Sequence, residues 1–170
     1  TPVNDAPVAT DDAVTVAEDQ PYSSSVSLIA NDSDLDGDSL SAVAGSFTTA
    51  QGGTIVIAAD GQYSYQPRAN YHGSDSVDYV VTDGSASDTG TLTLTVTPLN
   101  DAPVATDDAV TVAEDQLYSS SVSLIANDSD VDLDSLSAVA GSFTTAQGGT
   151  ITIAADGQYS YQPRANYHGS

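Results

Sequence analysis

The sequence predicts an all-β protein built from antiparallel Greek-key β-sandwich domains in tandem. Three observations carry this prediction. The chain repeats itself with a shift of 96 residues, each repeat reads as a series of short strands, and no long window places its apolar residues at helical spacing. About seven short strands in some 96 residues are typical of such a sandwich.

The repeat is nearly perfect. Residues 1–74 match 97–170 at all but five positions: Val3/Leu99, Pro21/Leu117, Leu35/Val131, Gly37/Leu133 and Val56/Thr152. A period of this length is far longer than that of solenoid repeats, so each repeat should be a domain with its own core.

The strands are read from their alternation. "GTLTLTV" (90–96) places its apolar residues on one face and its threonines on the other. "GTIVIAADGQYSYQP" (53–67) predicts a hairpin around Asp60-Gly61, with Ile55 and Ile57 facing the core and Val56 facing out. The remaining predicted strands are 13–18, 24–30, 39–47 and 76–83.

The second repeat has no counterpart of 75–98, which includes the last two predicted strands. We therefore predict a complete domain at 1–99 and an incomplete one at 100–170. In the alternative, 75–170 form the complete domain and 1–74 the incomplete one. The incomplete copy could also be poorly folded, or could borrow strands from another chain by strand exchange.

Composition excludes several classes of partner. The 170 residues carry 24 acidic side chains against two arginines, for a net charge of −22. The negative field of so many carboxylates disfavours nucleic acid and anionic membranes as partners. No segment is apolar for long enough to insert in a bilayer. There is no cysteine, so neither disulfides nor thiolate metal sites can form. The first residues read neither as a signal peptide nor as a chain start, so we expect the middle of a longer protein.

Aspartates at alternate positions predict a calcium site. "NDSDLDGDSL" (31–40) returns as "NDSDVDLDSL" (127–136), and calcium takes six to eight oxygen ligands, many of them carboxylates. The spacing is not that of an EF-hand, because the position of its last glutamate falls on Val43. In each copy the first two aspartates of the run are the predicted ligands and the next two are expected to be partly solvated; the predicted ligands are Asp32, Asp34, Asp128 and Asp130.

One substitution bears on the backbone of this loop. Leu133 replaces Gly37, and a turn that fixes a positive φ would penalise leucine. Either the second copy binds differently or the backbone is ordinary at this position. We favour an ordinary backbone.

Several motifs together resemble the cadherin-like tandem repeats of giant bacterial surface adhesins, of the RTX or VCBS type. They are "PVNDAPVATDD" (2–12), "AED" (17–19), "LIANDSDLDGDSL" (28–40), "ADGQYSYQPRANYHGSDS" (59–76) and "VTDG" (81–84). The resemblance implies an Ig/cadherin-like fold. It also implies secretion to the bacterial cell surface and calcium ions at or near the junctions between neighbouring repeats.

A more distant resemblance to eukaryotic cadherins implies roles for single residues. "LNDAP" (99–103), with Asn100 and Asp101, resembles the linker that supplies calcium ligands between domains. Glu18 resembles a glutamate at the far pole of the domain, and Asp83 resembles an aspartate that joins the Asp-x-Asp cluster of its own domain. The junction between the repeats would then collect five residues, namely Glu18, Asn100, Asp101, Asp128 and Asp130.

Nothing in the sequence predicts an enzyme, because the candidate acids lie in turns and accompany no recognisable pocket. The function we expect is a calcium-stiffened structural extender of a secreted adhesin, in cell adhesion or biofilm formation. The alternative is a module that binds a glycan or a protein, since repeated weak sites can act by avidity.

Overall fold

The computed structural model describes residues 3–169 and divides the chain into two compact units, Thr1–Leu99 (unit 1) and Asn100–Ser170 (unit 2). Each unit is considered by itself. The described residues form strands and turns but no helix, and hence no helix that could span a membrane.

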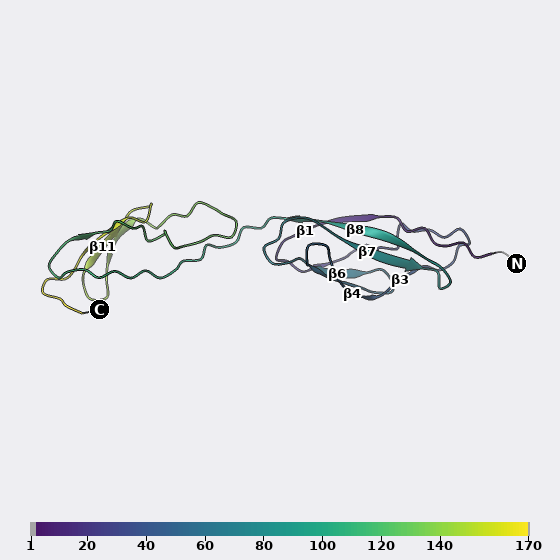
Figure 1. The fold of residues 1–170 in the computed structure, drawn as a ribbon, viewed down its shortest axis with the longest axis horizontal. Coiled ribbons are helices and arrows are strands. Elements are labelled where there is room, and N and C mark those ends of the chain that lie inside the picture. Colours follow the sequence, from purple (N-terminus) through teal and green to yellow (C-terminus); the bar gives the residue numbers. More distant parts are fainter. Residues whose placement is uncertain (1–2, 170) are drawn as a thin grey trace. The chain divides into compact units, whose positions relative to one another are not determined.

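Unit 1 consists of two four-stranded sheets (Figure 1). In the first sheet the order is β1-β8-β7-β3, with bounds Asp12–Ala17, Ser87–Thr97, Gly73–Thr82 and Ser41–Ala42. In the second the order is β2-β6-β5-β4, with bounds Tyr22–Ser23, Tyr63–Gln66, Thr54–Ile57 and Gly45–Thr48. Every pair of neighbours is antiparallel except β1–β8, which is parallel. The predicted all-β sandwich class is confirmed, with this one parallel pair added.

The core of unit 1 follows the alternation of its strands. Ile55 and Ile57 are buried and Val56 between them is 49% exposed, as the pattern predicted. β8 buries its leucines and valine while its threonines face solvent. The buried set contains three tyrosines, two of them from β6, so these rings pack inside the domain. Burial of such side chains contributes about 1.5–3 kcal/mol each.

The strand predicted at 24–30 is wrong. The short β2 ends at Ser23, so 24–30 contain no strand, and the chain turns at 28–30. The reason lies in Ser27, whose hydroxyl donates to the carbonyl of Asp60 at 2.6 Å and accepts from the amide of Ile29 at 3.2 Å. Local bonds of this kind offer the backbone an alternative to a ladder. The predicted strand at 39–47 is likewise divided, because β3 and β4 belong to different sheets.

β7 and β8 are the longest strands and lie at the centre of their sheet. They form a hairpin that pairs over ten residues, from Gly73↔Val96 to Thr82↔Ser87. β8 also pairs with β1, and β7 with β3. The segment that could have served either repeat is therefore part of unit 1.

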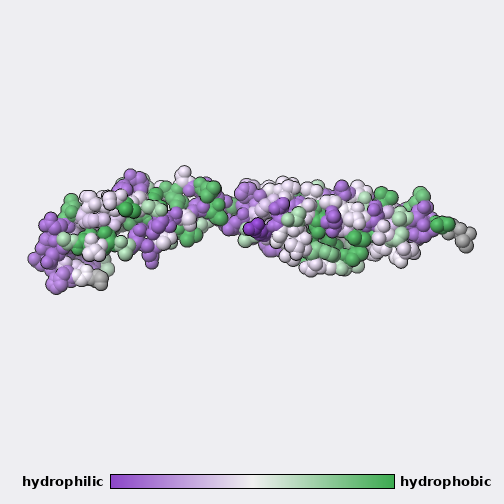
Figure 2. Space-filling view, in the orientation of Figure 1, coloured by the Kyte–Doolittle hydropathy of each residue, from purple (hydrophilic) through white to green (hydrophobic). Residues whose placement is uncertain are grey.

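Unit 2 has one sheet, in the order β10-β11-β12-β9 (Gly141–Thr144, Thr150–Ile153, Tyr159–Gln162 and Tyr118–Ser119). Its registers repeat those of the second sheet of unit 1. Residues 108–113, the counterparts of β1, form no strand, since unit 2 has no β8 for them to pair with. Apolar side chains are exposed on both units, as the space-filling view shows (Figure 2).

Candidate metal centre

The aspartate loop of unit 1 gathers three carboxylates. Asp34, Asp36 and Asp38 each offer an oxygen, and these oxygens lie within 4.8 Å of one another. Asp34 shapes the loop, because its Oδ1 accepts hydrogen bonds from the amides of Asp36 at 2.8 Å and Asp38 at 3.2 Å. Its Oδ2 is buried and accepts no hydrogen bond from the described residues. A buried carboxylate oxygen without a donor is costly unless a cation lies beside it.

The same loop is tied to the start of the domain. The amide of Asp5 donates to Oδ2 of Asp36 at 2.8 Å, and the side-chain amide of Asn4 donates to Oδ2 of Asp83 at 2.9 Å. Backbone amides of the turn after β7, and the bond from Asn4, lower the pKa of Asp83, so it carries its charge here. The Asn4–Asp5 stretch thus connects the aspartate loop with Asp83 at one end of unit 1.

Asp32 lies in a different environment from these three. Its Oδ1 accepts from the amide of Thr10 at 2.8 Å, and its Oδ2 is buried without a donor among the described residues. Burial raises the pKa of Asp32, the Thr10 amide opposes this, and the charges of Asp12 and Asp88 add to the rise. The structure groups Asp34 with Asp36 and Asp38 rather than with Asp32, and the assignment of Asp32 as a ligand stays a prediction.

Unit 2 repeats the loop. Asp130 Oδ1 accepts from the amides of Asp132 at 2.9 Å and Asp134 at 3.3 Å. The amide of Asp101 donates to Oδ2 of Asp132 at 2.6 Å, and that of Thr106 to Oδ1 of Asp128 at 2.8 Å. Asn100 bonds locally, to the carbonyl of Asp101 at 2.7 Å. Asn100 and Asp101 thus take the places that Asn4 and Asp5 occupy in unit 1.

The preference for an ordinary backbone at position 37 and its copy is wrong. Gly37 has φ +77° and Leu133 has φ +64°, so both loops adopt the left-handed conformation. The aspartate three residues earlier fixes this shape, since its carboxylate accepts hydrogen bonds from the amides on both sides of the turn. Leucine costs about 1–2 kcal/mol in such a conformation, and Leu133 buries little in return because it is 89% exposed.

Leu133→Gly should therefore stabilise unit 2. We expect a net gain of about 0.5–1 kcal/mol, because the relief of strain exceeds the entropy that glycine adds to the unfolded chain. Urea unfolding, monitored through the amide signals of β10–β12, measures this gain in stability. The reciprocal Gly37→Leu should cost unit 1 a similar amount. Equal stability of Leu133→Gly and the parent chain would show that the turn is not strained.

Glu18 lies at the other end of unit 1. It follows β1 directly and is 1% exposed. Its Oε1 accepts from the amide of Leu99 at 2.8 Å, and its Oε2 lies 3.7 Å from Nδ1 of His72. Glu18 belongs to unit 1 and the other four residues of the predicted junction site to unit 2, so their combination in one site stays a prediction.

Asp75 is a residue whose role the sequence did not reveal. It is 2% exposed at the start of β7 and accepts four hydrogen bonds. The donors are the hydroxyls of Thr49 and Tyr65 and the amides of Gln51 and Ser76. Burial raises the pKa of Asp75, but these four bonds more than offset it, and the pKa lies below its ordinary value. Asp75 therefore stabilises the fold, and its carboxylate has no capacity left for a metal.

Comparison with known proteins assigns the chain to a family. The model of the bacterial cadherin-like domain matches residues 4–98 and again 100–170. A search of curated proteins found no match. Among solved structures, an endo-fucoidan hydrolase of glycoside hydrolase family 107 is similar with 18% identity and a TM-score of 0.45. A variant of the same hydrolase gives 19% and 0.44.

This chain spans only 24% of the hydrolase's length, while 93% of this chain is covered. So low a structural similarity adds nothing on function. The two family matches, by contrast, cover both repeats. The chain therefore belongs to the family of bacterial cadherin-like domains.

Proposed function

We propose that this chain is a non-enzymatic, calcium-stiffened spacer of a secreted bacterial adhesin, acting at the cell surface in adhesion or biofilm formation. The observation that carries the proposal is the carboxylate group of Asp34, Asp36 and Asp38 with the unpartnered, buried Oδ2 of Asp34. Membership of the bacterial cadherin-like family supports the extracellular setting.

The donor set suits calcium better than other metals. The group offers only carboxylates, with backbone carbonyls in the same loop, and the chain has no cysteine and only two histidines. Hard oxygen ligands on a flexible loop are what calcium takes, whereas zinc prefers nitrogen and sulfur. In unit 1 the residues that would hold the ion are Asp34, Asp36 and Asp38, with Asp83 and the Asn4–Asp5 stretch beside them.

Charge gives a reason for the metal to matter mechanically. The chain has a net charge of −22, so its carboxylates repel one another, and no lysine is present to offset this repulsion. Each calcium ion would cancel two negative charges where they are most concentrated. Asp101, whose amide donates to Asp132 in the loop of unit 2, and its neighbour Asn100 would then be ordered by the same ions. Stiffness of a spacer would follow from this ordering.

A calcium titration of the full chain tests the proposal. Modules of this extracellular kind bind calcium with Kd values on the order of 10⁻⁴–10⁻³ M. A site at a hundredfold excess adds about 2.7 kcal/mol, which raises the melting temperature of a domain of this size by about 10 °C or more. Small-angle scattering with and without calcium reports whether the metal narrows the range of conformations.

Asp34→Asn is the informative variant. The asparagine oxygen can still accept the two loop amides, so the turn is retained while the charge is lost. We expect the affinity of unit 1 for calcium to fall by about tenfold or more. Asp60→Asn, in the exposed turn of the β5–β6 hairpin, is the matched control and should respond like the parent chain. Equal melting temperatures in calcium and in chelator would sink the proposal.

A further inference from the structure

Unit 1 has a pocket of about 310 Å³, the β1–β2 pocket, lined by β1 at the edge of its sheet, by β2 and the segment after it, and by β6. Four apolar side chains, two tyrosines, two serines and one carboxylate line it: Asp12, Ala13, Val14, Tyr22, Ser25, Val26, Ser27, Leu28 and Tyr63. Its volume is at the lower end of the range of about 300–1,000 Å³ for small-molecule sites. The pocket shares no residue with the carboxylate group of the aspartate loop.

Two tyrosine rings line the β1–β2 pocket as a fixed pair. The ring centroids of Tyr22 and Tyr63 are 6.0 Å apart, and the ring planes are tilted by 46°. The amide of Ser24 donates to the carbonyl of Tyr63 at 2.8 Å, and the amide of Tyr63 donates to Ser24 Oγ at 2.9 Å. Tyr63 is only 9% exposed. Backbone bonds and burial therefore hold the pair in place without a ligand.

The other walls are held by hydrogen bonds as well. All of β1 pairs in parallel with β8. The segment after β2 is bonded to the β5–β6 turn, because the Ser27 hydroxyl donates to the carbonyl of Asp60 and the amide of Leu28 donates to the carbonyl of Gly61 at 3.0 Å. A preformed site avoids the cost of ordering its walls on binding.

Asp12 gives the β1–β2 pocket a negative charge. Burial raises the pKa of Asp12 and the charge of Asp11 adds to the rise, while the bond from the Tyr79 hydroxyl opposes it. Burial also raises the pKa of Tyr63, and the charge of Asp12 adds to that rise. Among the nine residues that line the pocket there is no lysine or arginine. A cation in the pocket would therefore lie beside a carboxylate that has no positive partner there.

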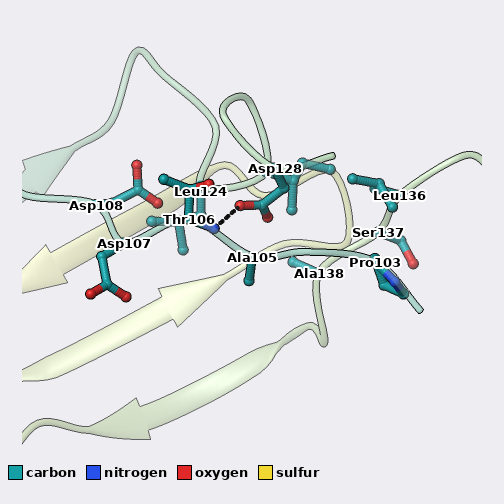
Figure 3. Close-up of a pocket in the computed structure, with 11 residues that line it drawn as sticks. Pro103, Ala105, Thr106, Asp107, Asp108, Leu124, Asp128, Leu136, Ser137 and Ala138 are labelled. Atoms are coloured by element: carbon teal, nitrogen blue, oxygen red, sulfur yellow. Dashed lines mark hydrogen bonds between the residues drawn. The ribbon is translucent and has the colours of Figure 1, made fainter. Parts of the chain in front are cut away.

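A second carboxylate, that of Asp32, lies close enough to add to this field. Burial raises the pKa of Asp32, the Thr10 amide opposes the rise, and the charge of Asp12 adds to it. The same bond recurs in unit 2, where Asp128 accepts from the amide of Thr106 (Figure 3). Because the whole chain has a net charge of −22, the pocket attracts cations and repels anions.

We propose that the β1–β2 pocket binds a trimethylammonium group, carried by a small solute or by a lipid headgroup. A cation is attracted to an aromatic ring when it lies within about 6 Å of the ring centroid. Since the centroids of Tyr22 and Tyr63 are 6.0 Å apart, one nitrogen can lie within this distance of both. Asp12 supplies the opposite charge, and the four apolar side chains contact the methyl groups.

The walls suit a methylated cation better than other cations. Calcium takes six to eight oxygen ligands, whereas the pocket has a single carboxylate. A primary ammonium donates three hydrogen bonds and is costly to bury without acceptors. Acceptors are scarce here, because Asp12 Oδ2 already accepts from Tyr79 and the Ser27 hydroxyl is bonded to backbone groups. A trimethylammonium group donates no hydrogen bond, so it needs none of these acceptors.

A titration of the full 170-residue chain with choline tests the proposal. It is monitored by NMR through the amide signals of unit 1, in excess calcium so that the metal sites are filled. We expect saturable shifts at 12–14 and 25–28. Neohexyl alcohol, the neutral analogue with carbon in place of nitrogen, should bind at least about tenfold more weakly, since it lacks the charge. Ethanolamine, which lacks the three methyl groups, should be weaker by a similar factor of about tenfold.

Variants of the two charged and aromatic walls give matched comparisons. Tyr22→Leu removes one ring and Asp12→Asn removes the charge, and each should weaken choline binding by about tenfold or more. Tyr22→Phe retains the ring and should bind like the parent chain. Asp78→Asn removes an exposed carboxylate outside the pocket and should also leave binding unchanged.

A further pair of variants locates the site without a change in the core. Val26 is 65% exposed, so Val26→Lys leaves the fold intact while its ammonium competes for the pocket and should abolish binding. Val56→Lys adds the same charge at a position that is 49% exposed on β5, outside the pocket, and should have no effect.

The outcomes separate this proposal from the calcium role, on which it does not rest. Absence of saturable shifts, equal binding of neohexyl alcohol or ethanolamine, or binding that survives Val26→Lys would overturn it. Choline binding that appears only in chelator would overturn it too, since the carboxylate would then serve a metal. Vesicles of phosphatidylcholine identify the source: loss of the same signals on adding vesicles indicates a headgroup, and no effect of vesicles indicates a free solute.

Discussion

Asp75→Ala is expected to destabilise unit 1 by about 3–5 kcal/mol. The substitution leaves the hydroxyls of Thr49 and Tyr65 and the amide of Gln51 without their acceptor in a buried site. Each unsatisfied buried group costs about 1–3 kcal/mol. Because a domain of this size is stable by only about 5–15 kcal/mol, the loss is a large fraction of the total.

Urea unfolding followed by the amide signals of β7 and β8 measures this effect. Unit 2 has no counterpart of Asp75, so the signals of β10–β12 provide an internal reference that should not change. Asp75→Asn retains one acceptor oxygen and should cost less than Asp75→Ala. Asp78→Asn, an exposed change three residues along β7, is the control. A cost below about 1 kcal/mol for Asp75→Ala would contradict the role given to this carboxylate.

The same group makes unit 1 sensitive to acid. The folded-state pKa of Asp75 is lowered, so its contribution to stability is fully present above the ordinary aspartate pKa of about 3.9. The contribution is lost as the pH falls through the folded-state pKa, because the unfolded chain then binds the proton more readily. Stability curves of the parent chain and of Asp75→Asn should therefore converge below about pH 4.

Tyr79→Ala is expected to cost unit 1 about 3–5 kcal/mol, as is usual for loss of a large buried aromatic residue. The ring is 2% exposed and packs against Gly90, the residue opposite it on β8. A Cβ added at Gly90 would meet the Tyr79 ring at 2.7 Å, so the glycine leaves the space that the ring occupies. Thermal and urea unfolding of the variant, with unit 2 as the reference, gives the value.

Tyr79→Phe separates the hydroxyl from the ring. This variant removes the hydroxyl, which donates its single proton to the Thr10 carbonyl and Asp12 Oδ2. The loss should lower the stability of unit 1 by about 1–2 kcal/mol. Burial and the bond to Asp12 both raise the pKa of Tyr79, so the hydroxyl remains protonated at neutral pH. If Tyr79→Ala and Tyr79→Phe lost the same stability, the ring would contribute nothing beyond its hydroxyl.

The sequence by itself determined the class of fold and the pattern of its core. Alternation places Ile55 and Ile57 inside and Val56 outside, and the structure agrees. Strict alternation is reliable here because a shift of one residue would turn every apolar side chain to the solvent. The near-identity of the two copies likewise predicted one domain for each repeat, and the aspartate run marked the loop in which three carboxylates gather.

Only the tertiary structure decided the features that depend on partners distant in sequence. No strand forms at 24–30, where the Ser27 hydroxyl bonds instead to Asp60, 33 residues away. Asp75 is a stabilising residue only because β4–β5 and β6 bring their donors to it. The turn at Leu133 is local by contrast, because its positive φ follows from the carboxylate of Asp130, three residues away, against the preference of leucine itself. The physical reason is the same in each case: propensity acts on single residues, whereas a hydrogen bond from another residue can stabilise the backbone by more than the local preference costs.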